Sequence, residues 1–340
     1  MVNAKESKDV EFGNLVVRFG EKVLLDHFDE IFLPALTSNY SRNYSDTRYF
    51  FEKVDLLSFG KEDGTGLPIL GVVGRIIKDG VLRRDQVYVD GELRQKPGKM
   101  QSSPSALFLL ILHNHRLVYL KETADAPSKD TFRSTLLQFL KRKHQEVVRA
   151  KKVEIDEEFP TLAERRVAKE ALSEEYGTPT VQLISLSSAG TVRDFIKRYQ
   201  TLKQVKITFS ETNDENPMHD FFAQFKRAKE EVGSDASSIV HHASKGLDKE
   251  QAIEQITEAT EQGINGVHLS GVDDDGSRLL GNNDDFKLKK TINRVSNDPV
   301  KAAGTLLDAF NGLVKDGIIK VEATAKATAR RIEGIFNEHW

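Results

Sequence analysis

The chain has 340 residues, of which 39% are hydrophobic and 30% charged, a composition typical of a folded protein rather than a disordered one. It contains no cysteine, which excludes disulfide scaffolds, thiolate zinc sites and cysteine nucleophiles. No apolar run approaches the roughly 20 residues of a membrane-spanning helix, and the first residues lack the apolar core of a secretion signal. We therefore expect a cytoplasmic protein without membrane insertion, and its length predicts two domains.

The formal net charge of −3 is unevenly distributed along the chain. Residues 1–150 carry 23 basic and 20 acidic side chains, whereas residues 151–340 carry 26 and 32. The positive excess is concentrated between Arg75 and Arg149, where 15 basic residues stand against 8 acidic ones. A local excess of this kind is typical of a surface that binds phosphate or nucleic acid.

The first part of the chain predicts a strand, a helix and a second strand. Residues 15–19 predict the first strand, and the apolar segment 23–36 predicts a helix that ends near Pro34, because proline interrupts helical hydrogen bonding. A polar loop at 37–48 then leads to a strand at about 49–59. These elements begin an α+β domain.

Residues 69–121 predict a run of antiparallel strands, because apolar-rich segments alternate with turn signals such as Asp-Gly. We expect turns at 78–80, 90–91 and 113–116, and strands at 69–77, 81–89, 107–112 and 117–120. Helix-start residues at 127–130 and apolar residues at helical spacing then predict a helix through residue 150. We interpret residues 10–150 as a mostly antiparallel sheet covered by helices on one side.

Residues 151–177 are highly charged and predict a helical connector that ends at Gly177. Residues 178–340 alternate strands with helices and predict an acidic C-terminal α+β domain of layered-sandwich type, for which a ferredoxin-like arrangement is one concrete form. The predicted strands are 181–186, 205–209, 238–242, 266–272, 277–288 and 318–322, and the predicted helices are 191–202, 217–232, 248–262, 298–316 and 326–337.

Nine basic residues on the predicted hairpins and on one helix form the main candidate site. They are Arg83, Arg84, Arg94, Lys96, Lys99, Arg116, Lys141, Arg142 and Lys143. If they share one face, they would release counterions from a phosphate backbone. Aromatic residues are sparse in this region, so we expect backbone contacts rather than base stacking. Protection of strand edges and cations near a helix C-terminus are the simpler explanations.

An acidic cluster provides a candidate metal site at Asp273, Asp275 and Asp284. Carboxylates at alternate positions of a turn can gather around Mg²⁺. The calcium-loop pattern is not met, because Ser277 stands at its fifth position and no glutamate stands at its twelfth. A plain hairpin turn is the simpler explanation, since Asp-Gly is common in such turns.

Other motifs also have simple explanations. His113–His115 falls in a predicted turn, where asparagine tolerates a positive φ. The neighbours His241–His242 point to opposite faces of a strand, and His219–Asp220 occupies the first turn of a helix, where aspartate is expected. The loop Ser187–Thr191 precedes a helix and could hold a phosphate, but Thr191 as an ordinary N-cap explains it.

These patterns leave three functional hypotheses. The leading one is a non-enzymatic nucleic-acid-binding protein without a cofactor, of the kind found in bacterial or phage accessory systems of the defence type. Its C-terminal domain would form a homo-oligomer or bind a protein partner. The second is a nuclease or phosphotransfer enzyme that uses Mg²⁺ at residues 273–285. The third is a scaffold that contacts only protein.

Overall fold

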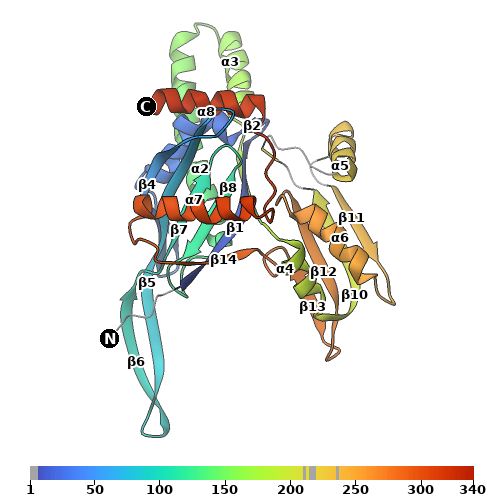
Figure 1. The fold of residues 1–340 in the computed structure, drawn as a ribbon. Coiled ribbons are helices and arrows are strands. Elements are labelled where there is room, and N and C mark those ends of the chain that lie inside the picture. Colours follow the sequence, from blue (N-terminus) through green and yellow to red (C-terminus); the bar gives the residue numbers. More distant parts are fainter. Residues whose placement is uncertain (1–6, 210–211, 214–219, 235–236) are drawn as a thin grey trace.

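The computed structural model describes residues 7–209, 212–213, 220–234 and 237–340. In these residues two antiparallel sheets, one of ten strands and one of four, are packed against helices (Figure 1). This mixture of helices and antiparallel strands confirms the α+β class expected from the sequence.

The larger sheet has a main path in the order β14-β1-β8-β7-β5-β4-β3, with β2 and β9 paired to β1 and β6 paired to β5. Every one of these pairs is antiparallel. The strands are β1 (Ser7–Phe19), β2 (Lys22–Val23), β3 (Arg42–Tyr44), β4 (Thr47–Lys61), β5 (Pro68–Val89), β6 (Glu92–Ser102), β7 (Ser105–Ile111), β8 (Arg116–Lys121), β9 (Pro179–Ser185) and β14 (Lys289–Asn293).

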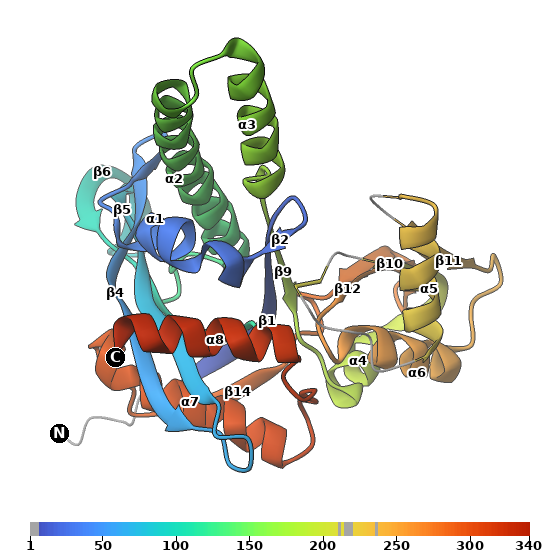
Figure 2. The ribbon, with the colours of Figure 1, turned by 90° about the horizontal axis from the view of Figure 1, so that it is seen from above.

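Helices cover both faces of the larger sheet, because its central strands are apolar on both sides. In β7, Phe108 and Leu110 face one core, whereas Leu107 and Leu109 face the other, as the two-residue period of a strand requires. Helices α2, α8 and the segment from η1 to α1 belong to the first core, and α7 covers the second (Figure 2). Their bounds are η1 (Leu24–His27), η2 (Phe28–Phe32), α1 (Leu33–Thr37), α2 (Lys129–Glu158), α7 (Pro299–Lys315) and α8 (Lys326–His339).

The sequence predicted helices on one side only, because α7 lies far from the first strands in the sequence. The segment after β2 also differs from its prediction, since it forms three short helical pieces. Pro34 stands in the first turn of α1, where its missing N–H costs no helical hydrogen bond. The proline therefore begins a helix rather than ending one.

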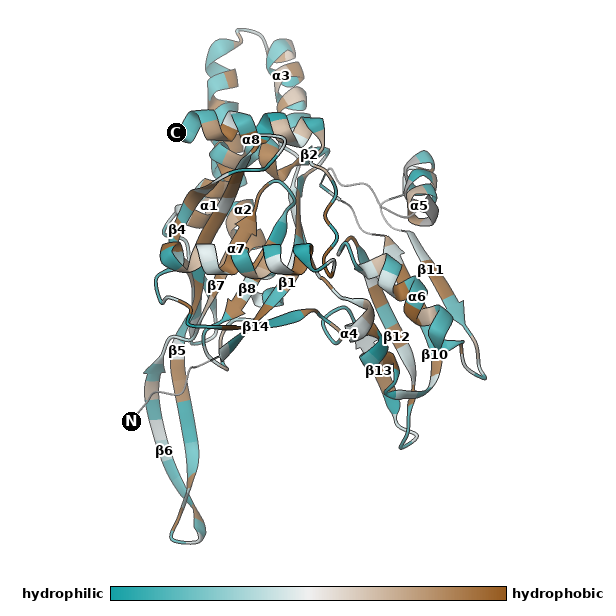
Figure 3. Cartoon of the chain, viewed as in Figure 1, coloured by the Kyte–Doolittle hydropathy of each residue, from teal (hydrophilic) through white to brown (hydrophobic). Residues whose placement is uncertain are grey.

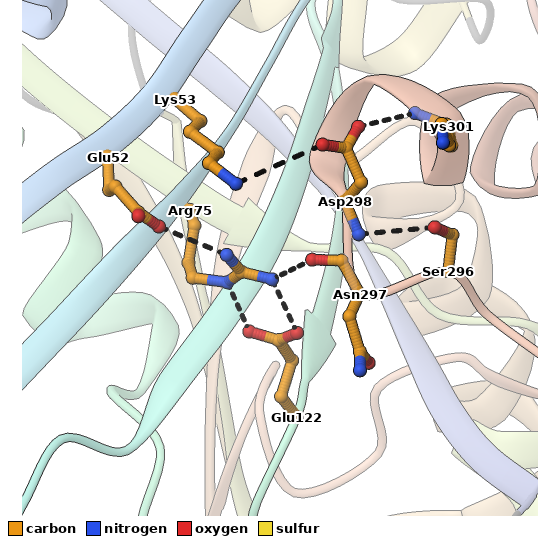
Figure 4. A network of polar contacts seen from close by, with 8 residues as sticks. All are labelled: Glu52, Lys53, Arg75, Glu122, Ser296, Asn297, Asp298 and Lys301. Carbon is orange, nitrogen blue, oxygen red and sulfur yellow. Dashed lines mark hydrogen bonds and ion pairs between the residues drawn. The ribbon is translucent and has the colours of Figure 1, made fainter.

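A network around Arg75 fixes the start of α7 on the larger sheet (Figure 4). Its guanidinium donates to both carboxylate oxygens of Glu122, which follows β8, at 2.6 and 3.0 Å, and to Glu52 on β4 at 3.0 Å. It also donates to the carbonyl of Asn297, beside the Asp298 N-cap of α7. The charge of Arg75 is thus neutralised within the fold.

The predicted charged connector forms part of a helical hairpin. Helix α2 continues to Glu158, and α3 (Leu162–Glu175) folds back along it, so that the pair extends beyond the larger sheet (Figure 2). Thr161 caps α3 with a capping box that involves Glu164, which explains where the chain reverses. Helix α3 ends before Gly177, as the sequence predicted.

The smaller sheet has the strand order β11-β10-β12-β13. Helices α4 and α6 pack on one face of it, with Ile256, Val267 and Ile207 in the shared core. The chain order from β10 is β-α-β-α-β-β, which differs from the β-α-β-β-α-β order of a ferredoxin-like unit. The elements are α4 (Ala189–Ile196), β10 (Tyr199–Phe209), α5 (Asp220–Glu231), β11 (Ser237–His242), α6 (Lys249–Thr260), β12 (Asn265–Asp273) and β13 (Arg278–Asn282).

The segment 187–287, which carries the smaller sheet, is inserted into one edge of the larger sheet. β9 and β14 follow one another along β1 in the same direction, and the Leu288 N–H donates to the Leu186 carbonyl at 2.7 Å. The C-terminal unit expected at 178–340 is therefore divided, because β9, β14, α7 and α8 all pack in the larger sheet's layers.

Some other predicted boundaries also differ from the structure. The predicted helix 191–202 ends at Ile196, because Tyr199 already begins β10. The strand expected at 318–322 does not form among the described residues, although Ile319 is buried in the second core. The predicted start of a helix at Asn216-Pro217 lies outside the described residues.

Candidate nucleic-acid interface

The β-arm, defined as residues 80–102, is a two-stranded ribbon that extends beyond the larger sheet (Figure 1). It consists of the second half of β5 and the whole of β6. Asp90 and Gly91 join the strands with positive φ angles of 54° and 80°, as a type I′ hairpin turn requires. The turn predicted at 90–91 is confirmed, and most side chains of the β-arm are exposed.

β5 runs without interruption into the β-arm, so the turn predicted at Lys78–Gly80 is wrong. Asp79 pairs with Arg48 of β4, and its carboxylate accepts a hydrogen bond from that guanidinium at 3.1 Å. A Cβ on Gly80 would lie 3.1 Å from the Thr47 hydroxyl. Gly80 therefore permits the close approach of the β3–β4 hairpin rather than a turn.

Cross-strand pairing gives the β-arm two different faces, since paired residues point to the same side. One face carries large apolar side chains together with Arg84 and the Gln86–Gln95 pair, and the other carries three cations. Figure 3 shows the resulting mixture of hydrophilic and hydrophobic positions along both strands. The pairs are Leu82–Met100, Arg84–Gly98 and Tyr88–Leu93 on the first face, and Arg83–Lys99 and Val87–Arg94 on the second.

The β-arm carries five basic and three acidic side chains, a net charge of +2. Two of the cations have exposed carboxylate partners, since Arg83 contacts Asp46 and Arg94 lies 3.3 Å from Glu92. The other three form no ion pair with any residue that the structure describes. The five predicted cations on the β-arm are Arg83, Arg84, Arg94, Lys96 and Lys99.

The remaining predicted basic residues lie elsewhere. Arg116 is only 4% exposed and lines a polar cavity, where a nucleic acid backbone cannot reach it. Lys141–Lys143 lie on α2, which extends from the sheet in the opposite direction to the β-arm (Figure 1). Arg142 and Lys143 both lie near Glu146, at 3.5 and 3.6 Å. The nine candidate residues therefore do not share one face.

The charge excess counted between residues 75 and 149 is also smaller at the surface than in the sequence. Arg75 is bound by two carboxylates, and Arg116 and Lys129 are buried. These three cations serve the interior of the fold. The accessible part of the excess is concentrated on the β-arm and on α2.

The predicted metal ligands are separated. Asp273 closes the turn after β12, and its carboxylate accepts backbone hydrogen bonds from Asp275 at 3.1 Å and Ser277 at 2.8 Å. Asp284 lies beyond the other end of β13, a strand that spans roughly 15 Å, and there it contacts Lys129. Among the described residues, no group of three His, Asp or Glu side chains could hold a metal ion.

The His113–His115 turn joins β7 to β8, as predicted, but it is packed into the fold instead of forming an exposed tip. It lines a cavity of about 250 Å³ together with the segment 321–325 before α8. His115, and not Asn114, has the positive φ, at 55°. Burial lowers the pKa of His113 to about 4, so its imidazole is neutral at physiological pH.

The remaining motifs behave as local structure. His241 and His242 alternate in exposure along β11, as the two-residue period of a strand requires. Ser188 caps α4 and accepts a hydrogen bond from the Thr191 N–H at 3.3 Å, so the N-cap lies one turn earlier than predicted. His219 lies outside the described residues.

A buried ionic cluster around Lys129 was not predicted. The Lys129 ammonium donates a hydrogen bond to the Ser185 hydroxyl. Its nitrogen lies 3.3 Å from a carboxylate oxygen of Glu11 and 3.4 Å from one of Asp284. The Lys287 ammonium also lies 2.9 Å from Glu11. Burial lowers the pKa of Lys129, and the two carboxylates offset part of this effect. In the sequence, this lysine is visible only as a helix-start residue, because its partners come from distant strands and loops.

Neither a comparison of the chain with protein-family models nor a search of curated proteins gives a match. Among the described residues, no helix combines the length and the apolar character that crossing a membrane requires. The function is therefore inferred from the geometry of this chain alone.

Proposed function

We propose that this protein binds double-stranded DNA through the β-arm, mainly by contacts with the phosphate backbone. The observation that carries the proposal is an exposed two-stranded ribbon with basic side chains on both faces. The major groove of B-form DNA admits a two-stranded ribbon. The major groove of A-form RNA is too deep and narrow for side chains to read, so the ribbon favours DNA.

The positions of the charges support backbone contacts. A ribbon in a groove has phosphates on both sides, so cations on opposite faces can both reach them. Arg83 and Arg94 would exchange exposed carboxylate partners for phosphates, and such surface ion pairs contribute little stability on their own. Tyr88 and Leu93 are 74% and 64% exposed near the end of the β-arm, where they can contact sugars or base edges.

Removal of three β-arm cations tests the proposal. We expect the variant Arg84→Ala/Lys96→Ala/Lys99→Ala to bind duplex DNA more weakly than the wild type at low salt. Each lost phosphate contact makes the negative slope of log K against log salt shallower by about 0.9. The slope of the variant should therefore be less negative than that of the wild type by roughly 2 to 3. Fluorescence anisotropy over a salt series measures both the affinity and the slope.

The matched control is Lys141→Ala/Arg142→Ala/Lys143→Ala, which removes three cations from α2 and leaves the β-arm intact. We expect this variant to keep the wild-type slope. Circular dichroism establishes that both variants are folded. If the α2 variant loses the salt dependence and the β-arm variant keeps it, or if the wild type binds no duplex at low salt, the proposal is wrong.

A further inference from the structure

β11 is an unprotected edge strand of the smaller sheet. In the described part of the chain it pairs only with β10, and it lies at the outer side of the sheet in Figure 1. Exposed edges are usually blocked by charged residues, proline or a very short strand. The edge strand β14 carries Lys289 and Lys290, and β3 has only three residues. The six residues of β11 include no lysine, arginine, carboxylate or proline.

A groove of about 500 Å³ runs beside this edge, between β11 and α6. Val205 and Ala252 are buried and, with Leu247, provide apolar surface in the groove. His241 points into the groove from β11, and its Nε2 has no hydrogen-bond partner among the described residues. An exposed edge beside a groove is the arrangement that accepts an added strand, because the edge supplies main-chain hydrogen bonds and the groove receives alternate side chains.

The charge of the groove indicates what kind of strand it accepts. Among the residues that the structure describes, three carboxylates line it, from Asp248, Glu254 and Glu258, and no lysine or arginine does. The carboxylates of Glu254 and Glu258 lie one helical turn apart on α6, on the side that faces the groove. An extended segment with basic residues at alternate positions would place its cations beside them.

We propose that β11 and α6 form a docking site for an extended basic segment of a partner protein, which adds to the smaller sheet as a strand. A second copy of this chain is a weaker candidate, because the β11 strand that it would present carries no charge to match the carboxylates. The proposal does not depend on DNA binding by the β-arm, which lies on the larger sheet.

A short synthetic peptide of alternating lysine and valine, capped at both ends, is the probe. We expect it to bind the full chain, whereas the matching glutamate–valine peptide should bind at least about tenfold more weakly. Hydrogen exchange should slow at the backbone amides of 237–242 when the lysine peptide is bound, since a strand that is added at this edge protects them.

Charge reversal on α6 separates this site from general attraction between a basic peptide and an acidic protein. We expect Glu254→Lys/Glu258→Lys to lower the affinity by about tenfold or more. The control Glu154→Lys/Glu158→Lys makes the same change at the same spacing on α2 and should leave the affinity unchanged. Equal effects of the two variants, or no slowing at β11, would overturn the proposal. Sedimentation that reveals dimers through β11 would overturn it in favour of a second copy.

Discussion

At the scale of single residues, burial decides which charged side chains are available for binding. Arg116 was a candidate binding residue and Lys129 a helix-start residue in the sequence, yet both are less than a tenth exposed. A buried charge must be paired to remain charged, and Lys129 contacts Glu11 and Asp284 accordingly. The cations that remain for a partner are mainly those of the β-arm and α2.

His113 should make the stability of the protein depend on pH. Its pKa is lowered to about 4 by burial, so the unfolded state, with an ordinary histidine, binds a proton first as the pH falls. Protonation therefore favours unfolding below about pH 6.5. When the pH falls from about 7.5 to about 5, the free energy of unfolding of the wild type should decrease by about 2 kcal/mol more than that of His113→Gln.

Urea unfolding at the two pH values measures this difference. His242→Gln serves as a control, because the His242 ring is exposed on β11. This variant should keep the pH dependence of stability that the wild type has. A wild type and a His113→Gln variant with parallel pH dependence would contradict the expectation.

At the scale of elements, close backbone contacts decide where strands and helices end. Gly80 looks like a turn residue in the sequence, but in the structure it lets one hairpin approach another. Gly177 has a similar role where the chain returns from α3 to β9. A Cβ at this position would lie 2.5 Å from the Gly20 nitrogen and 2.6 Å from its Cα, and neither backbone atom can move easily.

We therefore expect Gly177→Ala to lower the free energy of unfolding by about 2 to 3 kcal/mol, the cost of overpacking against rigid backbone. Gly334→Ala is the matched control, because Gly334 lies within α8 and no atom would meet its Cβ within 4 Å. The free energy of unfolding of that variant should be about 0.5 to 1 kcal/mol higher than that of the wild type, since alanine favours the helix. Thermal unfolding compares the two, and equal stabilities would contradict the explanation.

In the complete fold, β9 and β14 act as one edge strand along β1 that is interrupted by the insert, residues 187–287. The insert leaves and re-enters the larger sheet at adjacent positions, so its removal need not disturb the pairing with β1. We expect a chain in which a short Gly-Ser linker replaces residues 187–287 to fold with the larger sheet intact. It should be less stable than the wild type, because Asn213 donates to and accepts from the backbone of β1.

Circular dichroism and cooperative thermal unfolding test this expectation. A chain cut after residue 177 is the comparison, since it lacks β9, β14, α7 and α8 and should not fold. If the linker variant is as disordered as the cut chain, the larger sheet depends on the insert.

Local sequence patterns correctly predicted the α+β class, the Asp90-Gly91 and 113–116 turns and the end of α3 before Gly177, whereas β6 was not among the predicted strands. These features depend on local rules, namely turn residues, caps and the period of apolar positions. Five of the nine predicted basic residues lie on the β-arm, of which the local pattern predicted only the strand at 81–89 and the turn at 90–91.

The remaining features follow from the tertiary structure, because each depends on pairing between distant segments. β9 and β14 pair with β1, and β5 continues as a strand through Asp79 and Gly80 because it pairs with β4 there. Helix α7 packs on the second face of the sheet. The tertiary structure also buries Arg116 and separates the β-arm from Lys141–Lys143. No local pattern contains this information, because burial and register arise from contacts between residues far apart in the chain.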